Sequence, residues 1–312
     1  MVEPAVGERI TWPHTEHLKG RAKLVVANVA SVTATSVMLS DGTFIPFDFL
    51  VLAPGNGGLV GKPTHTTLAA RRAFFVAEAA RIGAAKSILI VGGGPVGVEL
   101  AGEIVTDFPG KKVLLVHSGA SLMDSGMAGD SFAGKFSGNI TAAARSAGVK
   151  VLTNARMTRT ADGVFGGTTE SGEDVSAYLV YDCTGSRPST AFLQGNIPLS
   201  PSGYIKVEKT LQVVGKSNVF ALGDAADTGD LKQGYTARDQ AALVCANIEA
   251  ALAKRGLKAL KPAPVMIFVS VGRKAGVGLL PMCGGCVVGS GMVAGIKSKG
   301  LFIDDTRKDH GV

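Results

Sequence analysis

The chain has 312 residues, of which 46% are hydrophobic and 18% are charged, so it can bury sizeable cores and is not of the disordered class. The net charge of +7 is scattered, and with four tyrosines and one tryptophan for base stacking it does not indicate a nucleic-acid partner. Four dispersed cysteines and an N-terminus without an apolar signal segment exclude a disulfide-rich secreted scaffold, so we expect a cytoplasmic protein.

The length favours about two domains, and the first 57 residues are expected to form short strands and turns. Strand-like runs cover 23–26, 31–35, 36–39 and 47–53. Ser40-Asp41-Gly42 is typical of a hairpin turn between two of these strands. The segment Pro54 to Gly58 predicts a first crossover between domains.

Residues 87–104, SILIVGGGPVGVELAGEI, carry the strongest motif. An apolar run over 88–91 is typical of a buried parallel strand, and a helical pattern follows it. Between them, Gly92, Gly94 and Gly97 occupy the three fixed places of a GxGxxG fingerprint, which lets the backbone turn tightly and approach a pyrophosphate. A second apolar strand ends about 20 residues later, as a dinucleotide site requires. We therefore predict a dinucleotide site here, with a purely structural glycine turn as the alternative.

His117 closes that second strand, where an NAD-selective site usually places Asp or Glu to bind the ribose 2′-hydroxyl. No carboxylate at this position repels a 2′-phosphate, so NADPH should be tolerated and the choice between NADH and NADPH stays open. Two interpretations of His117 are equally good. Either it caps the adenosine ribose, or it is a solvated residue at the end of the strand.

Other elements follow from apolar periodicity and from turn residues. In chain order they are a helix over 71–81, a poorly patterned stretch over 118–138, a short helix over 141–147, a strand over 150–153, a hairpin around Ala161-Asp162-Gly163, a strand over 178–183 that ends at the second crossover, Thr184-Gly185, a strand over 217–222 that ends at Gly223-Asp224, a helix over 238–254 and a linker over 261–264. From Val265 onward we expect strand and turn.

Four motifs, in this order along the chain, resemble those of the pyridine nucleotide-disulfide oxidoreductase superfamily. They are FDFLVLAPG at 47–55, the fingerprint, LVYDCTG at 179–185 and SNVFALGDAADTGDLKQGY at 217–235; the ending KSKGLFI at 297–303 also fits. The most similar branch is the apoptosis-inducing-factor-like group that includes ferroptosis suppressor protein.

The resemblance implies an α/β fold with two Rossmann-like dinucleotide-binding domains and a small C-terminal α+β segment. The FAD-binding domain would comprise 1–57 and 184–260, with an NAD(P)-binding domain inserted at 58–183. Residues 261–312 would form the C-terminal domain.

The resemblance also implies site residues. In that family the Asp of the Gly-Asp pair accepts hydrogen bonds from the flavin ribitol, which matches Gly223 and Asp224, and Gly55 and Gly185 end the two flanking motifs. A carboxylate at the end of a parallel strand lies where α/β folds place ligands, although a turn-capping Asp is the alternative. Lys232 matches a basic position that faces either the flavin or solvent.

Glu99 aligns with a family glutamate near the nicotinamide and flavin rings and is the candidate catalytic residue. Its alternative role, shared with Glu103 one turn further on, is that of a solvated acid that complements the helix dipole.

The sequence departs from the family pattern in two places. The family's first GxGxxG, which binds the FAD pyrophosphate, is absent, so we expect a truncated FAD domain with an incomplete sheet. Pro54 stands where the family has Thr, which removes a hydroxyl near the flavin.

The expected function is that of an FAD-dependent NAD(P)H oxidoreductase that passes hydride from nicotinamide to flavin and electrons to a quinone-like acceptor. The alternative is a truncated NAD(P)H-binding protein without flavin or catalytic activity. A homodimer is a further expectation.

Several other features carry less weight. Cys283 and Cys286 have redox spacing but do not open a helix after a strand, and His14 and His17 lack the further ligands of a metal site. The uncharged stretch 275–296 is too rich in glycine for a transmembrane helix. An apolar and basic set near the C-terminus has two interpretations, which are peripheral contact with an anionic membrane and an ordinary docking segment of the C-terminal domain. That set is Met292, Val293, Ile296, Leu301 and Phe302 with Lys297 and Lys299.

Overall fold

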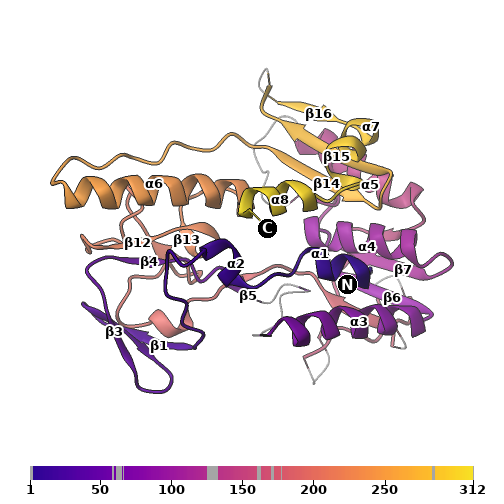
Figure 1. Ribbon diagram of the computed structural model, residues 1–312. Coiled ribbons are helices and arrows are strands. Elements are labelled where there is room, and N and C mark those ends of the chain that lie inside the picture. Colours follow the sequence, from indigo (N-terminus) through magenta and orange to yellow (C-terminus); the bar gives the residue numbers. More distant parts are fainter. Residues whose placement is uncertain are drawn as a thin grey trace. The chain divides into compact units, whose positions relative to one another are not determined.

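The computed structural model of the chain describes residues 3–57, 60, 65, 67–124, 133–159, 163–169, 172–176, 178–282 and 285–311. These residues fall into two compact units, whose elements are labelled in Figure 1. Unit 1 contains Met1–Leu24, Leu59–Gly185 and Val265–Val312, and unit 2 contains Val25–Gly58 and Ser186–Pro264.

Unit 1 is built on a four-stranded parallel sheet. Its strands, in spatial order, are β8 (Lys150–Leu152), β7 (Lys112–Val116), β6 (Ser87–Val91) and β9 (Leu179–Asp182). Each strand is a short apolar run, and the two central ones are buried on both faces, which is typical of a parallel sheet. The four strands predicted for this region are therefore confirmed.

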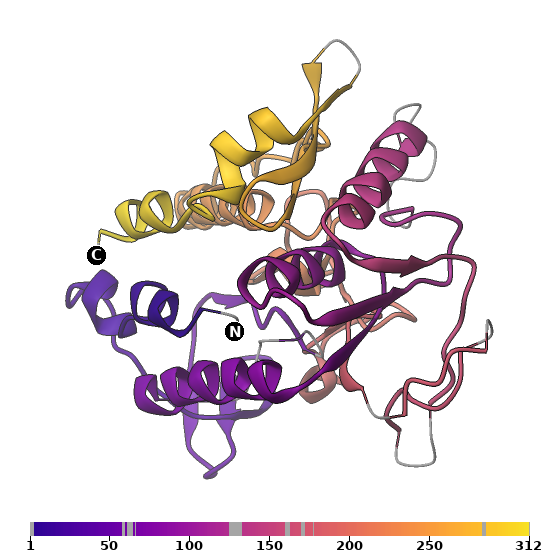
Figure 2. The same cartoon turned by 90° about the vertical axis from the view of Figure 1, so that its right-hand side faces the viewer.

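Helices cover one face of this sheet, and irregular chain covers the other (Figure 2). The helices are α3 (Leu68–Ala84), α4 (Pro95–Asp107) and α5 (Ala133–Ser146). They pack against the face that carries Ile88 and Ile90, whereas Leu89 and Val91 face the segment with Phe165 and Val175. This alternation follows from the period of two along a strand.

The C-terminal segment completes the core of unit 1. An antiparallel sheet of β14 (Ile267–Val271), β15 (Ala275–Leu280) and β16 (Cys286–Val288) packs against α4 and α5. Val269 and Leu279 of this sheet belong to the same buried cluster as Ile104 of α4. The structure thus differs from the expected separate domain over 261–312, because the segment shares its apolar core with the nucleotide-binding sheet.

Helices follow this sheet, where strand and turn were expected. They are α7 (Ser290–Val293), a π-helical turn over Ala294–Ser298 and α8 (Ile303–His310). Val293 and Ile303 are buried on their inner faces. The pattern-based expectation of strand and turn alone was wrong for α7 and the turn after it, because tertiary burial outweighs the low helix propensity of this glycine-rich stretch. The α+β segment that the resemblance implies is confirmed.

The N-terminal segment also belongs to unit 1, although the expected boundary placed it in the FAD domain. It forms α1 (Pro4–Arg9) and α2 (His14–Leu18). Gly7 lies so close to the ring of Phe75 in α3 that a Cβ atom there would come within 2.6 Å of the ring. This contact between distant parts of the chain gives no signal in local sequence pattern.

Unit 2 combines small sheets with one long helix. An antiparallel sheet contains β1 (Val29–Val32), β2 (Ser36–Leu39) and β3 (Phe44–Pro46), and β4 (Leu50–Leu52) pairs in parallel with β12 (Val219–Ala221). The remaining pairs are β5 (Asn56–Gly57) with β10 (Arg187–Pro188), and β11 (Ile205–Lys206) with β13 (Ala226–Asp227). The long helix is α6 (Gly234–Leu252).

Several expected elements have different bounds. Residues 23–26 form no strand, and Val26 is 69% exposed, because the run finds no partner strand in the described part of the chain. α5 begins at Ala133 rather than at Thr141, because burial of Phe136 and Ile140 outweighs its glycines. Of the predicted 161–163 hairpin, Ala161 and Asp162 lie outside the described residues, as do Gly58 of the first crossover and residues 125–132.

No helix among the described residues is long and apolar enough to cross a membrane. No group of three or more His, Cys, Asp or Glu side chains among them could hold a metal ion.

Candidate functional site

The fingerprint forms a tight turn between β6 and α4. Gly92 has a φ of +111°, and a Cβ atom there would overlap the carbonyl oxygen of Cys183 at the end of β9. A Cβ atom at Gly97 would overlap the carbonyl oxygen of Gly92 itself. Both glycines are therefore required by the packing of α4 against the sheet.

Gly94 is different, because the space beside it is open. It is the N-cap residue of α4, it makes no side-chain cap, and Pro95 follows it within the first turn. A Cβ atom at Gly94 would have no neighbour within 4 Å. No side chain at Gly94 therefore blocks the N-terminus of α4, where the first-turn N–H groups and the positive end of the helix dipole lie, and this arrangement fits a pyrophosphate.

His117 lies behind this turn and is not a solvated residue. Its exposed fraction is 9%, so that interpretation is wrong. Its Nδ1 accepts a hydrogen bond from the Gly93 N–H at 3.1 Å, and its Nε2 lies 2.9 Å from Oδ1 of Asp124. Because Nδ1 is an acceptor, the proton is assigned to Nε2, which donates to Asp124. Both ring nitrogens are thus engaged within the protein and are not available to a ribose hydroxyl.

The loop that follows β7 also forms a hydrogen bond with the backbone of the fingerprint. We call residues 117–124 the β7 loop. The N–H of Met123 donates to the carbonyl oxygen of Gly93 at 2.9 Å, so Gly93 is held through both of its backbone groups. Partial burial acts to raise the pKa of Asp124, but hydrogen bonds from His117 and from the Ser121 backbone outweigh it and keep that pKa below its usual value. Sequence reasoning missed the contact of Asp124 with His117, because it depends on how the β7 loop folds and periodicity gives no signal for it.

Glu99 projects from α4 towards the C-terminal segment. Its Oε1 forms an ion pair with Nζ of Lys297 at 2.6 Å and accepts a hydrogen bond from the Ser270 N–H at 3.3 Å. Glu103, one turn further on, pairs with Arg273. Neither acid is therefore a solvated side chain that only complements the helix dipole. A catalytic role for Glu99 stays a prediction.

The flavin motifs meet at one edge of unit 2. Because β4 and β12 are parallel, their carboxyl ends lie together, and Gly55 follows one while Gly223 and Asp224 follow the other. Gly55 and Gly223 both have positive φ, +69° and +70°, which favours glycine. The Gly223 N–H donates to Oε1 of Gln240 in α6 at 2.8 Å, a contact that the helical pattern did not reveal.

The remaining predicted flavin residues lie in different places. Nζ of Lys232 donates to the carbonyl oxygen of Ala226 at 2.5 Å and lies 5.1 Å from the centre of the Tyr204 ring. Gly185 ends the second motif in unit 1, with a φ of +127°. A second phosphate-binding fingerprint is not among the 312 residues.

A family model described as pyridine nucleotide-disulphide oxidoreductase matches residues 5–241. The chain belongs to this family. It is therefore an oxidoreductase, and its fold is the mixed α/β fold of the two-dinucleotide reductases.

Similar proteins cover most of the chain. "FAD-dependent oxidoreductase FVFD30" of Flammulina velutipes is 32% identical over 296 residues, covering 92% of this chain and 91% of that protein. "Ferroptosis suppressor protein 1" of Homo sapiens is 32% identical over 283 residues, covering 87% of this chain and 74% of that protein. Among solved structures, a ferredoxin reductase from Rhodopseudomonas palustris has a TM-score of 0.66 at 19% identity, covering 86% of this chain and 67% of that one.

The cysteines in the described part of the chain, Cys183, Cys245 and Cys286, are free thiols, so none of them forms a redox-active disulfide in this structure. Cys283 lies outside the described residues, and Cys286 is an exposed free thiol at the start of β16. Cys183 is buried beneath the fingerprint turn, and burial, with the nearby Asp182 charge, raises the pKa of its thiol to about 12.

We expect Cys183 to resist alkylation in the folded protein. With a pKa of about 12, roughly one thiol in ten thousand is ionised at pH 8, and the thiolate is the nucleophile. Iodoacetamide at pH 8 should label the exposed Cys245 and Cys286 first, and Cys183 only after denaturation. Peptide mass spectrometry resolves the sites, and rapid labelling of Cys183 in the folded state would contradict the packing of Gly92 over it.

The apolar and basic set near the C-terminus is only partly exposed. Met292, Ile296 and Phe302 are exposed, whereas Val293 is fully buried and the side chain of Lys297 is 21% exposed against Glu99. Val293 and Lys297 thus belong to a docking segment, because α7 and the turn after it pack on β15 and β14, whereas membrane contact of the exposed members stays a prediction.

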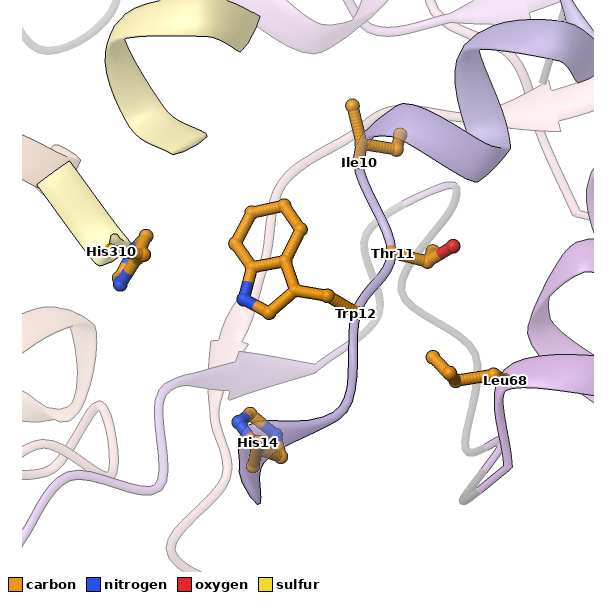
Figure 3. A pocket seen from close by; sticks show the side chains of 6 residues that line it. All are labelled: Ile10, Thr11, Trp12, His14, Leu68 and His310. Carbon is orange, nitrogen blue, oxygen red and sulfur yellow. The ribbon is translucent and has the colours of Figure 1, made fainter. Parts of the chain in front are cut away.

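A small pocket of about 270 Å³ lies between the two ends of the chain in unit 1 (Figure 3). It is lined by Ile10, Thr11, Trp12, His14, Leu68 and His310. Trp12 faces His310 with ring centres 5.6 Å apart. None of these residues belongs to a motif of the family, and the side chain of His17, the other histidine of the predicted pair, is outside the described set.

Proposed function

We propose that the chain is an FAD-dependent NAD(P)H oxidoreductase that passes hydride from nicotinamide to flavin and electrons to a quinone-like acceptor. The observation that carries the NAD(P)H part is the open N-terminus of α4 at Gly94, held in place by two glycines that tolerate no side chain. FAD and NAD(P)H are the cofactors that membership of the family supports.

The residues have distinct tasks in this proposal. The first-turn N–H groups of α4 bind the pyrophosphate of NAD(P)H, and His117 and Met123 hold Gly93 so that these groups keep their direction. Asp224, at the carboxyl end of β12, accepts hydrogen bonds from ribitol hydroxyls, while Gly55, at the carboxyl end of β4, lets the backbone approach the cofactor closely. FAD, when bound, supplies a ring that accepts hydride and hands electrons on.

A second candidate function is favoured by one observation. The 312 residues contain one GxGxxG, in unit 1, so no second fingerprint is present for the FAD pyrophosphate. A chain that binds NAD(P)H and retains no flavin would act as a binding or regulatory protein.

A visible absorption spectrum of the purified protein, taken anaerobically before and after NADH and then NADPH, separates the two candidates. A flavin band that bleaches supports the oxidoreductase. A colourless protein that gains no band with added FAD, yet binds NAD(P)H, contradicts it and favours the second function. If neither cofactor binds, both proposals fail.

We also propose an electron acceptor, a location and an oligomeric state for the protein, and each has its own test. The quinone-type acceptor rests on the family resemblance, and steady-state reduction of a short-chain ubiquinone compared with ferricyanide tests it. Peripheral membrane contact is supported by the exposed Met292, Ile296 and Phe302, and flotation with anionic liposomes tests it, while a cytoplasmic location is a further proposal. A homodimer is tested by light scattering after size exclusion.

We expect Glu99→Gln to lower kcat about 10- to 100-fold if Glu99 donates or accepts a proton near the nicotinamide and flavin rings. Glutamine keeps an oxygen that accepts from Ser270, so the melting temperature should change little. Glu103→Gln is the matched control, because Glu103 lies on the same helix and pairs with Arg273. If both variants keep the wild-type kcat, the catalytic role is contradicted and the Glu99–Lys297 pair is structural.

A further inference from the structure

The residue directly after β7 is His117, but the carboxylate of Asp124 contacts its side chain and so lies close to the end of this strand. His117 stands about 20 residues after Gly97, at the position where dinucleotide sites read the ribose 2′-hydroxyl with Asp or Glu. Its Nε2 lies 2.9 Å from Oδ1 of Asp124, whose side chain is 31% exposed. In other dinucleotide sites the residue that ends this strand usually carries the carboxylate itself. Here the carboxylate of Asp124 lies one imidazole ring further from the strand end.

We propose that Asp124 is the residue that makes this site prefer NADH to NADPH. The inference rests on the proposed NAD(P)H site at the fingerprint and deepens it. The imidazole of His117 serves as a spacer that connects the carboxylate to Gly93, and Asp124 supplies the negative charge that a 2′-phosphate would meet.

The charge of this pair is negative. Because Nδ1 of His117 accepts the Gly93 N–H, the ring is neutral in this arrangement, and the low pKa of Asp124 keeps the carboxylate ionised at neutral pH. Among the described residues, His117 is the one basic side chain within ion-pairing distance of Asp124. A 2′-phosphate placed next to it would meet a like charge that is partly shielded from water, which weakens binding.

The carboxylate is also held in place. A Cβ atom at Gly119 would overlap Oδ2 of Asp124, and the Ser121 N–H donates to the same oxygen at 3.4 Å. The Met123 N–H donates to Gly93, and the Leu122 N–H donates to Oγ1 of Thr141 in α5 at 3.2 Å. Since the β7 loop is tied to both the fingerprint and α5, Asp124 has little freedom to move away from a bound phosphate.

Arg156 is the residue that would favour NADPH if its side chain reached the 2′-phosphate. Arg156 is exposed and follows Ala155, whose N–H donates to the carbonyl oxygen of His117 at 3.0 Å. A guanidinium that reached the 2′-phosphate would favour NADPH. Asp124 is the stronger candidate, because it contacts the His117 side chain directly, whereas Arg156 connects through the backbone of its neighbour.

The test measures dissociation constants for NADH and NADPH with the full chain, by quenching of intrinsic fluorescence or by calorimetry. We expect wild type to bind NADH at least about tenfold more tightly. Asp124→Asn keeps an acceptor for His117 and loses the charge, so it should reduce the preference to within about twofold by improving NADPH binding. Arg156→Gln, the matched control, should leave the ratio unchanged.

Salt dependence of the wild type provides a measurement that needs no variant to fold. If a carboxylate repels the 2′-phosphate, raising the ionic strength should shrink the preference for NADH, whereas attraction by an arginine would make NADPH bind relatively less well. The proposal is overturned if wild type prefers NADPH, if the preference grows with salt, or if Asp124→Asn leaves the ratio unchanged. Failure of both nucleotides to bind wild type would instead overturn the proposed function, and this inference with it.

Discussion

A Gly94→Ala variant is expected to bind NADH and NADPH at least about tenfold more weakly than wild type, a loss of about 1.4 kcal/mol or more. The backbone accepts alanine here, because φ is −74° and ψ is −177°, and the added methyl group has no protein neighbour within 4 Å. The methyl group would occupy the open space in front of the first-turn N–H groups, where the pyrophosphate must approach the backbone closely.

The same substitution should leave stability nearly unchanged. Alanine is a poorer N-cap than glycine by up to about 1 kcal/mol, while the loss of backbone freedom in the unfolded chain offsets part of this cost. Binding titrations and thermal unfolding of the same samples separate the two effects. Gly138→Ala in α5, which also has no neighbour within 4 Å and is exposed, is the matched control and should bind as wild type. Equal binding by Gly94→Ala would mean that no phosphate lies at this helix end.

Gly102→Ala is expected to lower the free energy of unfolding by about 2 kcal/mol. A Cβ atom at Gly102 in α4 would lie 2.5 Å from the Gly272 nitrogen and 2.7 Å from Cα of Val271, which are backbone atoms at the end of β14. The helix and the C-terminal sheet would have to separate, and overpacking of this kind costs about 1–3 kcal/mol or more. The gain in helix propensity from glycine to alanine is only about 1 kcal/mol, so the steric cost outweighs it.

The expected result is a fall in melting temperature of about 4–8 °C, on the scale of 2–4 °C per kcal/mol for a unit of this size. Gly138→Ala again serves as the control, because in a helix without such a neighbour the same change should raise stability by about 0.5–1 kcal/mol. Because Gly102 is not part of the fingerprint, nucleotide affinity below the melting transition should change less than in Gly94→Ala. A Gly102→Ala protein as stable as wild type would contradict the close docking of β14 on α4.

Local spacing in the sequence was sufficient to predict the fingerprint turn and the strands around it. A buried parallel strand is a continuous apolar run, and the three fingerprint glycines are spaced by the geometry of one tight turn and one helical turn, so both signals lie within a few residues. For the same reason the strand ends that carry Gly55, Gly185 and Asp224 could be placed from their motifs. The sequence also predicted the changes of unit near 58 and 185, because turn-forming residues follow apolar strands there.

The tertiary structure decided which distant residues become partners. His117 was assigned to solvent or to a ribose, yet it binds Gly93 and Asp124, because the β7 loop folds back over the fingerprint. Glu99 pairs with Lys297, and the C-terminal sheet joins the core of α4 and α5, through contacts between segments far apart in the chain. Periodicity reports which face of an element is apolar and not which element covers that face, and the return of the Asp124 carboxylate to the end of β7 depends on how the β7 loop folds, which leaves no mark in local pattern.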